Sequence, residues 1–165
     1  MFQPGDLIIY GRTGVCRVEA IETMDGQPYY RLSPRYQSSG CVIRTPVEGK
    51  VFMRRLLTRE EAHALIDRIP EVRTSIPQAR SLRELSEHYL ASINTHDAAE
   101  LLAMTMSIYA KQQLAKRDKR RLGAIDERFL REGETLLFGE LAAVLDIAPE
   151  EVPAFIQARL ARNDQ

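Results

Sequence analysis

The amino-terminal third of the chain consists of short apolar runs separated by turn residues, which is typical of β-structure. Residues 4–6 (Pro-Gly-Asp) open a turn, and residues 7–10 (Leu-Ile-Ile-Tyr) follow as an apolar run. Residues 11–14, with a glycine at each end, then reverse the chain. The stretch 3–21 therefore predicts two β-strands joined by a turn.

The second run shows a period of two. Cys16, Val18 and Ala20 fall on one mostly apolar face, whereas Arg17 and Glu19 fall on the other. Such alternation predicts an antiparallel strand with one buried face and one solvated face.

Three further strands are expected before residue 57, after an Asp25-Gly26 hairpin turn. They cover residues 28–32, 41–45 and 51–54. Five short strands with closely spaced turns predict a compact, strongly bent barrel or sheet of roughly 55 residues.

The hydrophobic period changes to that of a helix after residue 57. Thr58 and Glu61 have the spacing of a capping box, so a helix is predicted to start there and to stop at Pro70. Residues 71–77 end in a second proline and are predicted to connect two domains. Apolar residues recur at helical spacing from about Gln78.

The remaining chain is predicted to be entirely helical. A helix capped near Thr95 should cover residues 98–116, and its apolar stripe continues beyond residue 121. Gly133 and Gly139 obscure the next boundary. Two final helices are expected at residues 141–145 and 153–160.

The charge of the chain is balanced overall but unevenly distributed. Of the 165 residues, 28% are charged, yet the formal net charge is zero, which does not favour a general polyanion binder. Residues 111–131 nevertheless hold eight Lys and Arg against three Asp and Glu, whereas residues 132–165 hold two against seven. A local basic face is therefore expected within a neutral protein.

The two cysteines, Cys16 and Cys41, both fall within predicted strands. Two cysteines are too few for a disulfide scaffold, so we expect small buried side chains in a reducing compartment. The sequence has no signal segment and no apolar run approaching the roughly 20 residues of a membrane span. We therefore expect a soluble, cytoplasmic monomer that does not bind membranes.

Four sequence fragments in a fixed order carry a resemblance to a known family. They are PGD at residues 4–6, GxxGV at 11–15, VEAIE at 18–22 and VIRTP at 42–46. In order and spacing they resemble the RNA-polymerase-interacting domain of the CarD/CdnL transcription regulators, which also occurs in transcription-repair coupling factors. The resemblance extends over the chain, because an all-helical remainder of matching length follows, and it is most secure for residues 1–60.

The resemblance implies an α+β fold. A small antiparallel β-barrel-like domain of SH3 or Tudor type is expected at residues 1–57, followed by an all-α helical bundle. Residues 58–77 would form a helix and connector, and residues 78–165 a helical DNA-binding domain.

The resemblance also implies a docking site for the RNA polymerase β subunit. In the family this domain binds a lobe of that subunit by edge-strand pairing and a basic side chain, which Arg44 matches. Met24 occupies the position of a second family arginine. The expected polymerase-binding residues are Met24, Val42, Ile43, Arg44, Thr45 and Pro46. The competing interpretation is that Arg44 is an ordinary solvated side chain.

A dense basic cluster is the candidate contact with the phosphates of promoter DNA. It comprises Lys116, Arg117, Lys119, Arg120 and Arg121, with Lys111 somewhat earlier. In the family a helix begins here at a serine, which is Ala115 in this chain, so Asp118 is expected to start the helix instead. A solvated helix end is the alternative.

Leu82 is the candidate for a second DNA contact. Family members carry a tryptophan here that wedges into the minor groove, and this chain has no tryptophan. Leu82 stands at or within a residue of that position, between Arg80 and Arg83, and leucine can act as an apolar wedge. It could equally be a core residue of an amphipathic helix.

Nothing in the sequence indicates catalysis, a metal or a cofactor. The three histidines are scattered, and no nucleophile motif, P-loop or dinucleotide fingerprint is present. Together with this absence, the resemblance implies a non-enzymatic bacterial transcription regulator that binds polymerase and promoter DNA and modulates open-complex stability. The main alternative is an adaptor whose helical domain binds another protein, and an enzyme is a distant third.

Overall fold

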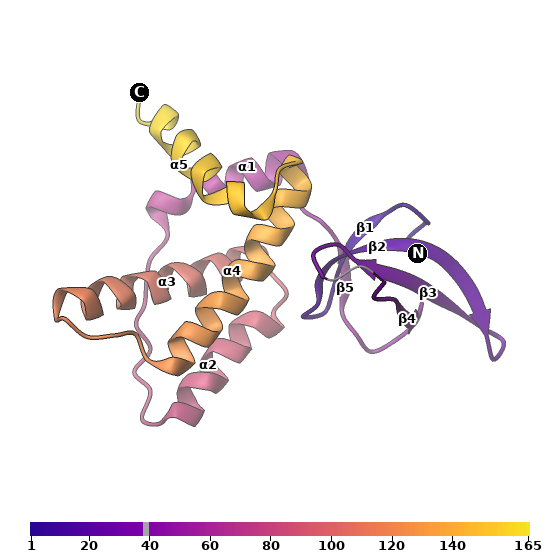
Figure 1. Ribbon diagram of the computed structural model, residues 1–165, viewed down its shortest axis with the longest axis horizontal. Helices are drawn as coiled ribbons and strands as arrows, with labels where there is room; N and C mark the ends of the chain where they lie inside the picture. Colours follow the sequence, from indigo (N-terminus) through magenta and orange to yellow (C-terminus); the bar gives the residue numbers. More distant parts are fainter. Residues whose placement is uncertain (38–39) are drawn as a thin grey trace.

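A computed structural model of the chain describes residues 1–37 and 40–165. An antiparallel sheet at the amino terminus is followed by a group of helices, and the two parts lie side by side (Figure 1). We call residues 1–57 the sheet domain and residues 58–165 the helical body.

The sheet contains five strands in the order β4-β3-β2-β1-β5. Their bounds are β1 Leu7–Tyr10, β2 Gly14–Met24, β3 Gln27–Pro34, β4 Ile43–Pro46 and β5 Met53–Arg55. The predicted α+β class is confirmed, but the predicted barrel-like closure is not seen. β4 and β5 form the two edges of an open sheet, and among the described residues no pairing joins them.

A β-bulge in β2 changes the predicted alternation. Cys16 and Val18 are buried as expected, but the register shifts between Val18 and Ala20. The extra residue turns Ile21 instead of Ala20 toward the core formed with Tyr30 and its neighbours.

The two cysteines have different environments. Cys16 is fully buried, whereas Cys41 is exposed and precedes the first residue of β4, Ile43. The expectation that both are buried within strands is wrong for Cys41. Its part of the chain is a connection that the sheet does not cover.

The helical body contains five α-helices in the described residues. They are α1 Arg59–Asp67, α2 Leu82–Asn94, α3 Ala98–Arg117, α4 Ala124–Leu145 and α5 Val152–Asn163, with short 3₁₀ helices at Ile69–Glu71 and Pro149–Glu151. The capping box of Thr58 and Glu61 is confirmed, since each side chain accepts a hydrogen bond from the other residue's backbone N–H.

Three predicted helix ends differ from the observed ones. α2 begins only after its cap Ser81. α3 is capped by Asp97 instead of Thr95, because Thr95 is the C-cap of α2 and its hydroxyl oxygen accepts the N–H of Asp97, which precedes α3. Asp118 is the C-cap of α3 and starts no helix, and α4 follows Gly123.

α4 continues through both glycines that obscured its end, so residues 141–145 are its last turns and form no separate helix. The reason lies in packing. A Cβ at Gly133 would lie 2.8 Å from Thr105 Oγ1 of α3, and one at Gly139 would lie 3.4 Å from the Tyr36 ring of the sheet domain. The glycines allow close neighbours against α4.

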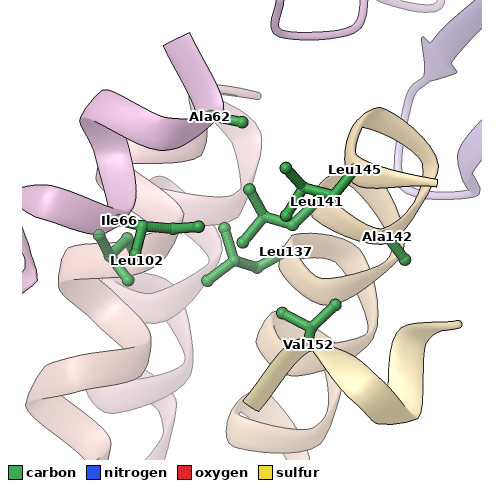
Figure 2. Close-up of a cluster of buried hydrophobic side chains, with 8 residues drawn as sticks. All are labelled: Ala62, Ile66, Leu102, Leu137, Leu141, Ala142, Leu145 and Val152. Carbon is green, nitrogen blue, oxygen red and sulfur yellow. The ribbon is translucent and has the colours of Figure 1, made fainter. Parts of the chain in front are cut away.

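Two apolar clusters hold the helical body together. One joins α1, α3, α4 and α5 through residues drawn in Figure 2: Ala62, Ile66, Leu102, Leu137, Leu141, Ala142, Leu145 and Val152. The other joins α2, α3 and α4 around Tyr89 and Phe129. Because Ala62 and Ile66 belong to the first cluster, α1 packs within the helical body.

No helix in the described part of the chain has the length and apolar character needed to cross a membrane. Within residues 1–37 and 40–165, no three His, Cys, Asp or Glu side chains gather as a metal ion would require.

Candidate functional site

β4 is a free edge of the sheet, because it pairs with β3 alone among the described strands. Thr45 stands opposite Tyr30, and two residues further on Val47 donates its N–H to Pro28 O. In an antiparallel pair the direction of the backbone groups alternates. The backbone groups of Ile43 and Thr45 therefore point to β3, and those of Arg44 point to the open edge.

The Arg44 side chain lies beside this edge and is half exposed. Its Nε is 3.5 Å from Glu22 Oε2, and the Arg31 guanidinium is 2.7 Å from Glu22 Oε1. Arg31 is also the cross-strand neighbour of Arg44. One carboxylate thus lies between two guanidinium groups, which leaves an excess positive charge next to unpaired backbone groups.

The other residues expected at this site differ in exposure. Met24 and Val42 are exposed, whereas Thr45 is buried and Ile43 and Pro46 are partly buried. Ile43 packs against the core of the sheet. Its side chain and that of Thr45 therefore face inward, and only their strand position contributes to the edge.

Two predicted DNA-binding segments, at the start of α2 and the end of α3, lie on the side of the helical body that faces away from β4 (Figure 1). Arg80, Leu82 and Arg83 lie at the start of α2. The basic cluster lies at the end of α3 and in the following turn, and its five side chains are all exposed: Lys116, Arg117, Lys119, Arg120 and Arg121. We call these eight residues the basic end.

The Leu82 side chain is 70% exposed, which contradicts the interpretation of Leu82 as a core residue. It is the first residue of α2, and the buried face of the helix begins one turn later at Leu85. An exposed leucine flanked by two exposed arginines agrees with the geometry of an apolar wedge, although it also fits a protein contact.

Lys111 is separated from the basic end by its own ion pair. Its Nζ lies 2.9 Å from the buried carboxylate of Asp126, which also accepts a hydrogen bond from the Tyr89 hydroxyl at 2.6 Å. Burial, together with this carboxylate, raises the pKa of Tyr89 well above its usual value. Lys111 therefore neutralises a buried charge and contributes little free charge to the surface.

Residues 2–57 match the family model described as the CarD-like/TRCF RID domain. The match covers almost all of the sheet domain and about a third of the chain. The resemblance predicted from four sequence fragments is thereby confirmed for these residues, and the match ends where the helical body begins. A search of curated proteins gave no match.

The RID family interacts with RNA polymerase, so the match indicates a protein associated with RNA polymerase. All five strands lie within the matched residues, including the free edge β4.

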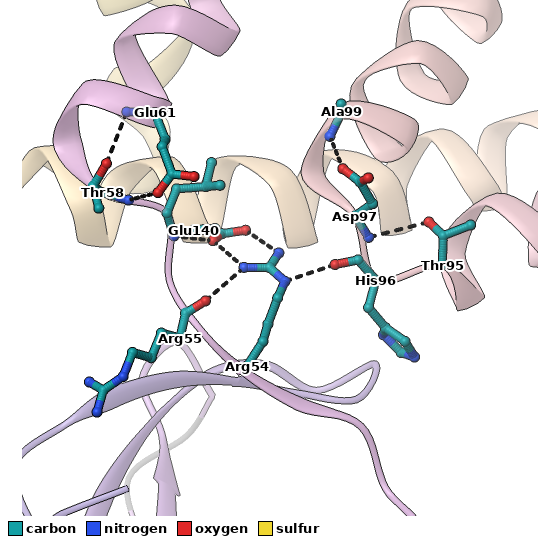
Figure 3. Close-up of polar contacts among 10 residues, drawn as sticks. Arg54, Arg55, Thr58, Glu61, Thr95, His96, Asp97, Ala99 and Glu140 are labelled. Carbon is teal, nitrogen blue, oxygen red and sulfur yellow. Dashed lines mark hydrogen bonds and ion pairs between the residues drawn. The ribbon is translucent and has the colours of Figure 1, made fainter.

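The opposite edge strand, β5, joins the sheet domain to the helical body. Arg54 of β5 makes a two-pronged ion pair with Glu140 of α4, at 2.7 and 2.8 Å (Figure 3). Its Nε donates to His96 O in the α2–α3 turn at 2.8 Å, and the Leu57 N–H donates to Glu140 at 2.9 Å. We call these contacts among Arg54, Glu140, His96 and Leu57 the joint.

Neither the sequence motifs nor the resemblance pointed to the joint. Glu140 is only 3% exposed and stands in the otherwise apolar stretch Leu136–Leu145 of α4. A buried carboxylate needs a partner, so a lone glutamate within an apolar helical run was the available signal. The hydrogen bond with Glu140 is the main reason that the pKa of Arg54 is raised.

Proposed function

We propose that this protein is a non-enzymatic bacterial transcription regulator. It binds the RNA polymerase β subunit through β4 of its RID domain and promoter DNA through the basic end, and it modulates the stability of the open complex. The RID match to residues 2–57 carries the proposal, and the free edge at β4 supports it.

Strand addition is the mode of docking that the β4 edge favours. A partner strand would pair with the outward backbone groups of Arg44, which supplies affinity through main-chain hydrogen bonds. The half-exposed Arg44 guanidinium would select a partner that carries a carboxylate near that edge.

The basic end is suited to phosphate contacts that do not depend on sequence. Its exposed lysines and arginines can replace counterions along the DNA backbone. Leu82 would supply an apolar contact at the edge of melted DNA. Because docking on polymerase raises the local concentration of DNA, weak contacts suffice for a protein of zero net charge.

The regulatory step in this proposal is linkage. A protein that binds polymerase and prefers the melted promoter shifts the closed complex toward the open complex. The shift cannot exceed the difference between its affinities for the two states.

The decisive experiment is a pull-down with RNA polymerase using Arg44→Glu. We expect the variant to lose co-purification with the β subunit, because it places like charge against the partner carboxylate. Arg17→Glu is the matched control, since Arg17 is an exposed arginine of the central strand β2. Retention of Arg44→Glu at the wild-type level would remove Arg44 from the site.

The exposed Leu82 also favours the second candidate function, in which the helical body binds a protein. The salt dependence of DNA affinity distinguishes a helical body that binds DNA from one that binds a protein. We expect neutralisation of Lys116, Arg117, Lys119, Arg120 and Arg121 to weaken binding and flatten its salt dependence. Negligible, identical binding by wild type and variant would favour the adaptor.

A further inference from the structure

In the joint, the Arg54 side chain contacts three separate segments of the chain. Arg54 Nη1 and Nη2 hold the Glu140 carboxylate of α4, Nε holds His96 O, and Nη1 also donates to Arg55 O at 3.0 Å (Figure 3). A planar guanidinium can make these contacts together because its donors are fixed in a fork. Arg54 thus orients β5, α4 and the α2–α3 turn relative to one another.

The turn that receives Arg54 has a constrained conformation. His96 has φ 55°, in the left-handed region that side-chain-bearing residues seldom adopt. The next residue, Asp97, caps α3 through a hydrogen bond from Ala99 N at 2.8 Å. The His96 ring stacks on Phe52, with 4.5 Å between centroids. Because both sides of the turn are held, the His96 carbonyl is presented to Arg54 in one direction.

The covalent connection could not impose this arrangement alone. Only Leu56 and Leu57 lie between the end of β5 and the cap of α1, and rotation about their backbone bonds would change the angle between the domains. Other contacts surround the joint, including the exposed pair Arg12–Glu132. Of the two interdomain ion pairs of the described residues, Arg54–Glu140 is the buried one: the glutamate side chain is 4% exposed, against 22% in Arg12–Glu132.

The joint lies between the two proposed binding surfaces. β4 is at the opposite edge of the sheet from β5, and the basic end lies beyond the start of α4. From residue 140 back to residue 124, α4 spans roughly 24 Å, so a rotation of about 10° at the joint would move its first turn by about 4 Å. A small angular change would therefore misplace the basic end relative to docked polymerase.

We propose that Arg54 is a positioning residue for the simultaneous binding of polymerase and DNA. It contacts neither partner, but it fixes the angle between the β4 edge and the basic end. This inference rests on the proposed function, because it concerns how the two sites of that function are coupled. Rigid coupling raises the effective concentration of the second site once the first is engaged.

Arg54→Lys is the most informative variant. Lysine keeps the positive charge opposite Glu140, but it cannot hold both carboxylate oxygens and His96 O at once. Arg159→Lys is the matched control, because Arg159 makes the same two-pronged contact with Asp67 inside the helical body, at 2.7 and 3.0 Å.

Three affinities are measured for each variant: for polymerase alone, for promoter DNA alone at low salt, and for the polymerase–promoter complex. For Arg54→Lys we expect the first two to stay within about twofold of wild type and the third to fall by about tenfold. Arg159→Lys should leave all three unchanged. Wild-type affinity of Arg54→Lys for the polymerase–promoter complex would overturn the inference.

The angle itself is measured from spin-label distances between Gln27 and Gln113, both exposed, in a Cys41→Ser background. We expect a broader distribution for Arg54→Lys and an unchanged one for Arg159→Lys. An equally narrow distribution in Arg54→Lys would overturn the inference whatever the affinities.

A double variant, Arg54→Met with Glu140→Met, guards against misfolding. Replacing a buried ion pair by apolar groups commonly preserves stability while removing its directional constraint. It should unfold near the wild-type temperature, yet show the broad distribution and the tenfold loss. Wild-type behaviour in both measurements would overturn the inference. Failure of the wild type to bind polymerase would instead overturn the proposed function.

Discussion

The two edge strands of the sheet each present an arginine to a glutamate, and the two pairs differ in almost every physical respect. Arg54 of β5 contacts both carboxylate oxygens of Glu140, at 2.7 and 2.8 Å, and the Glu140 side chain is 4% exposed. Arg44 of β4 approaches Glu22 only at 3.5 Å, and the two side chains are 50% and 31% exposed.

The difference separates structure from recognition. A buried carboxylate must keep its partner, because an unpaired charge away from water is costly. An exposed pair at long distance exchanges readily with water and with other ions. The arginine of β5 therefore ties its edge of the sheet to the helical body, whereas the arginine of β4 leaves its edge available to a partner.

The largest loss of stability is expected when the buried ion pair between Arg54 and Glu140 is broken. Arg54→Ala leaves Glu140 without its counter-ion, and we expect a loss of about 3 kcal/mol in the free energy of unfolding. Arg44→Ala should cost less than about 1 kcal/mol, since exposed pairs contribute little. Urea unfolding of both variants measures the difference. Equal losses would show that burial does not distinguish the two edges.

A smaller loss of stability is expected when a glycine of α4 is replaced by alanine. Gly133 lies within the helical body, and Gly139 lies beside the joint. In Gly133→Ala the new Cβ would meet buried Thr105 Oγ1 at 2.8 Å, and such overpacking costs about 1–3 kcal/mol. Helix propensity returns about 1 kcal/mol, so we expect a net loss of about 1 kcal/mol.

Gly139→Ala is the companion variant. Its Cβ would lie 3.4 Å from the Tyr36 ring, and the helix gains the same propensity. Its stability should stay within about 1 kcal/mol of wild type in the same urea series. A greater loss than in Gly133→Ala would mean that the contact between domains tolerates less than the helical interior.

The exposed edge was the part of the molecule that sequence reasoning could find. Strand β1 matches the predicted residues 7–10, and the capping box at Thr58 is local in sequence, so its spacing alone identifies it. Arg44 was predicted as a polymerase contact because its fragment, VIRTP, follows the other three fragments in the order that the family shows. The match to residues 2–57 confirms the resemblance, and the role of Arg44 stays a prediction.

What sequence reasoning missed depends on contacts between distant residues. Arg54 and Glu140 are 86 positions apart, and nothing local to either names its partner. Gly133 and Gly139 suggested helix ends, because glycine costs stability in a helix, yet close packing against α3 and Tyr36 prevailed. The bulge after Val18 likewise leaves no mark in the alternating pattern.

The two cysteines are expected to differ in their reactivity toward a thiol reagent, and Cys41 reports on the open edge at β4. Burial, with a smaller contribution from nearby Cys41, raises the pKa of the Cys16 thiol to about 11, so little reactive thiolate forms near neutral pH. Cys41 is exposed, two residues before β4. A thiol reagent at pH 7.5 should therefore label one cysteine in the native protein and two after denaturation.

The same labelling of Cys41 is then measured with polymerase bound. If a partner strand occupies the β4 edge, bound polymerase should slow the labelling of Cys41 severalfold, because the edge begins only two residues away. Arg17→Glu should retain this protection and Arg44→Glu should lose it. Labelling of Cys41 at an unchanged rate in a verified wild-type complex would locate the polymerase contact elsewhere on the sheet domain.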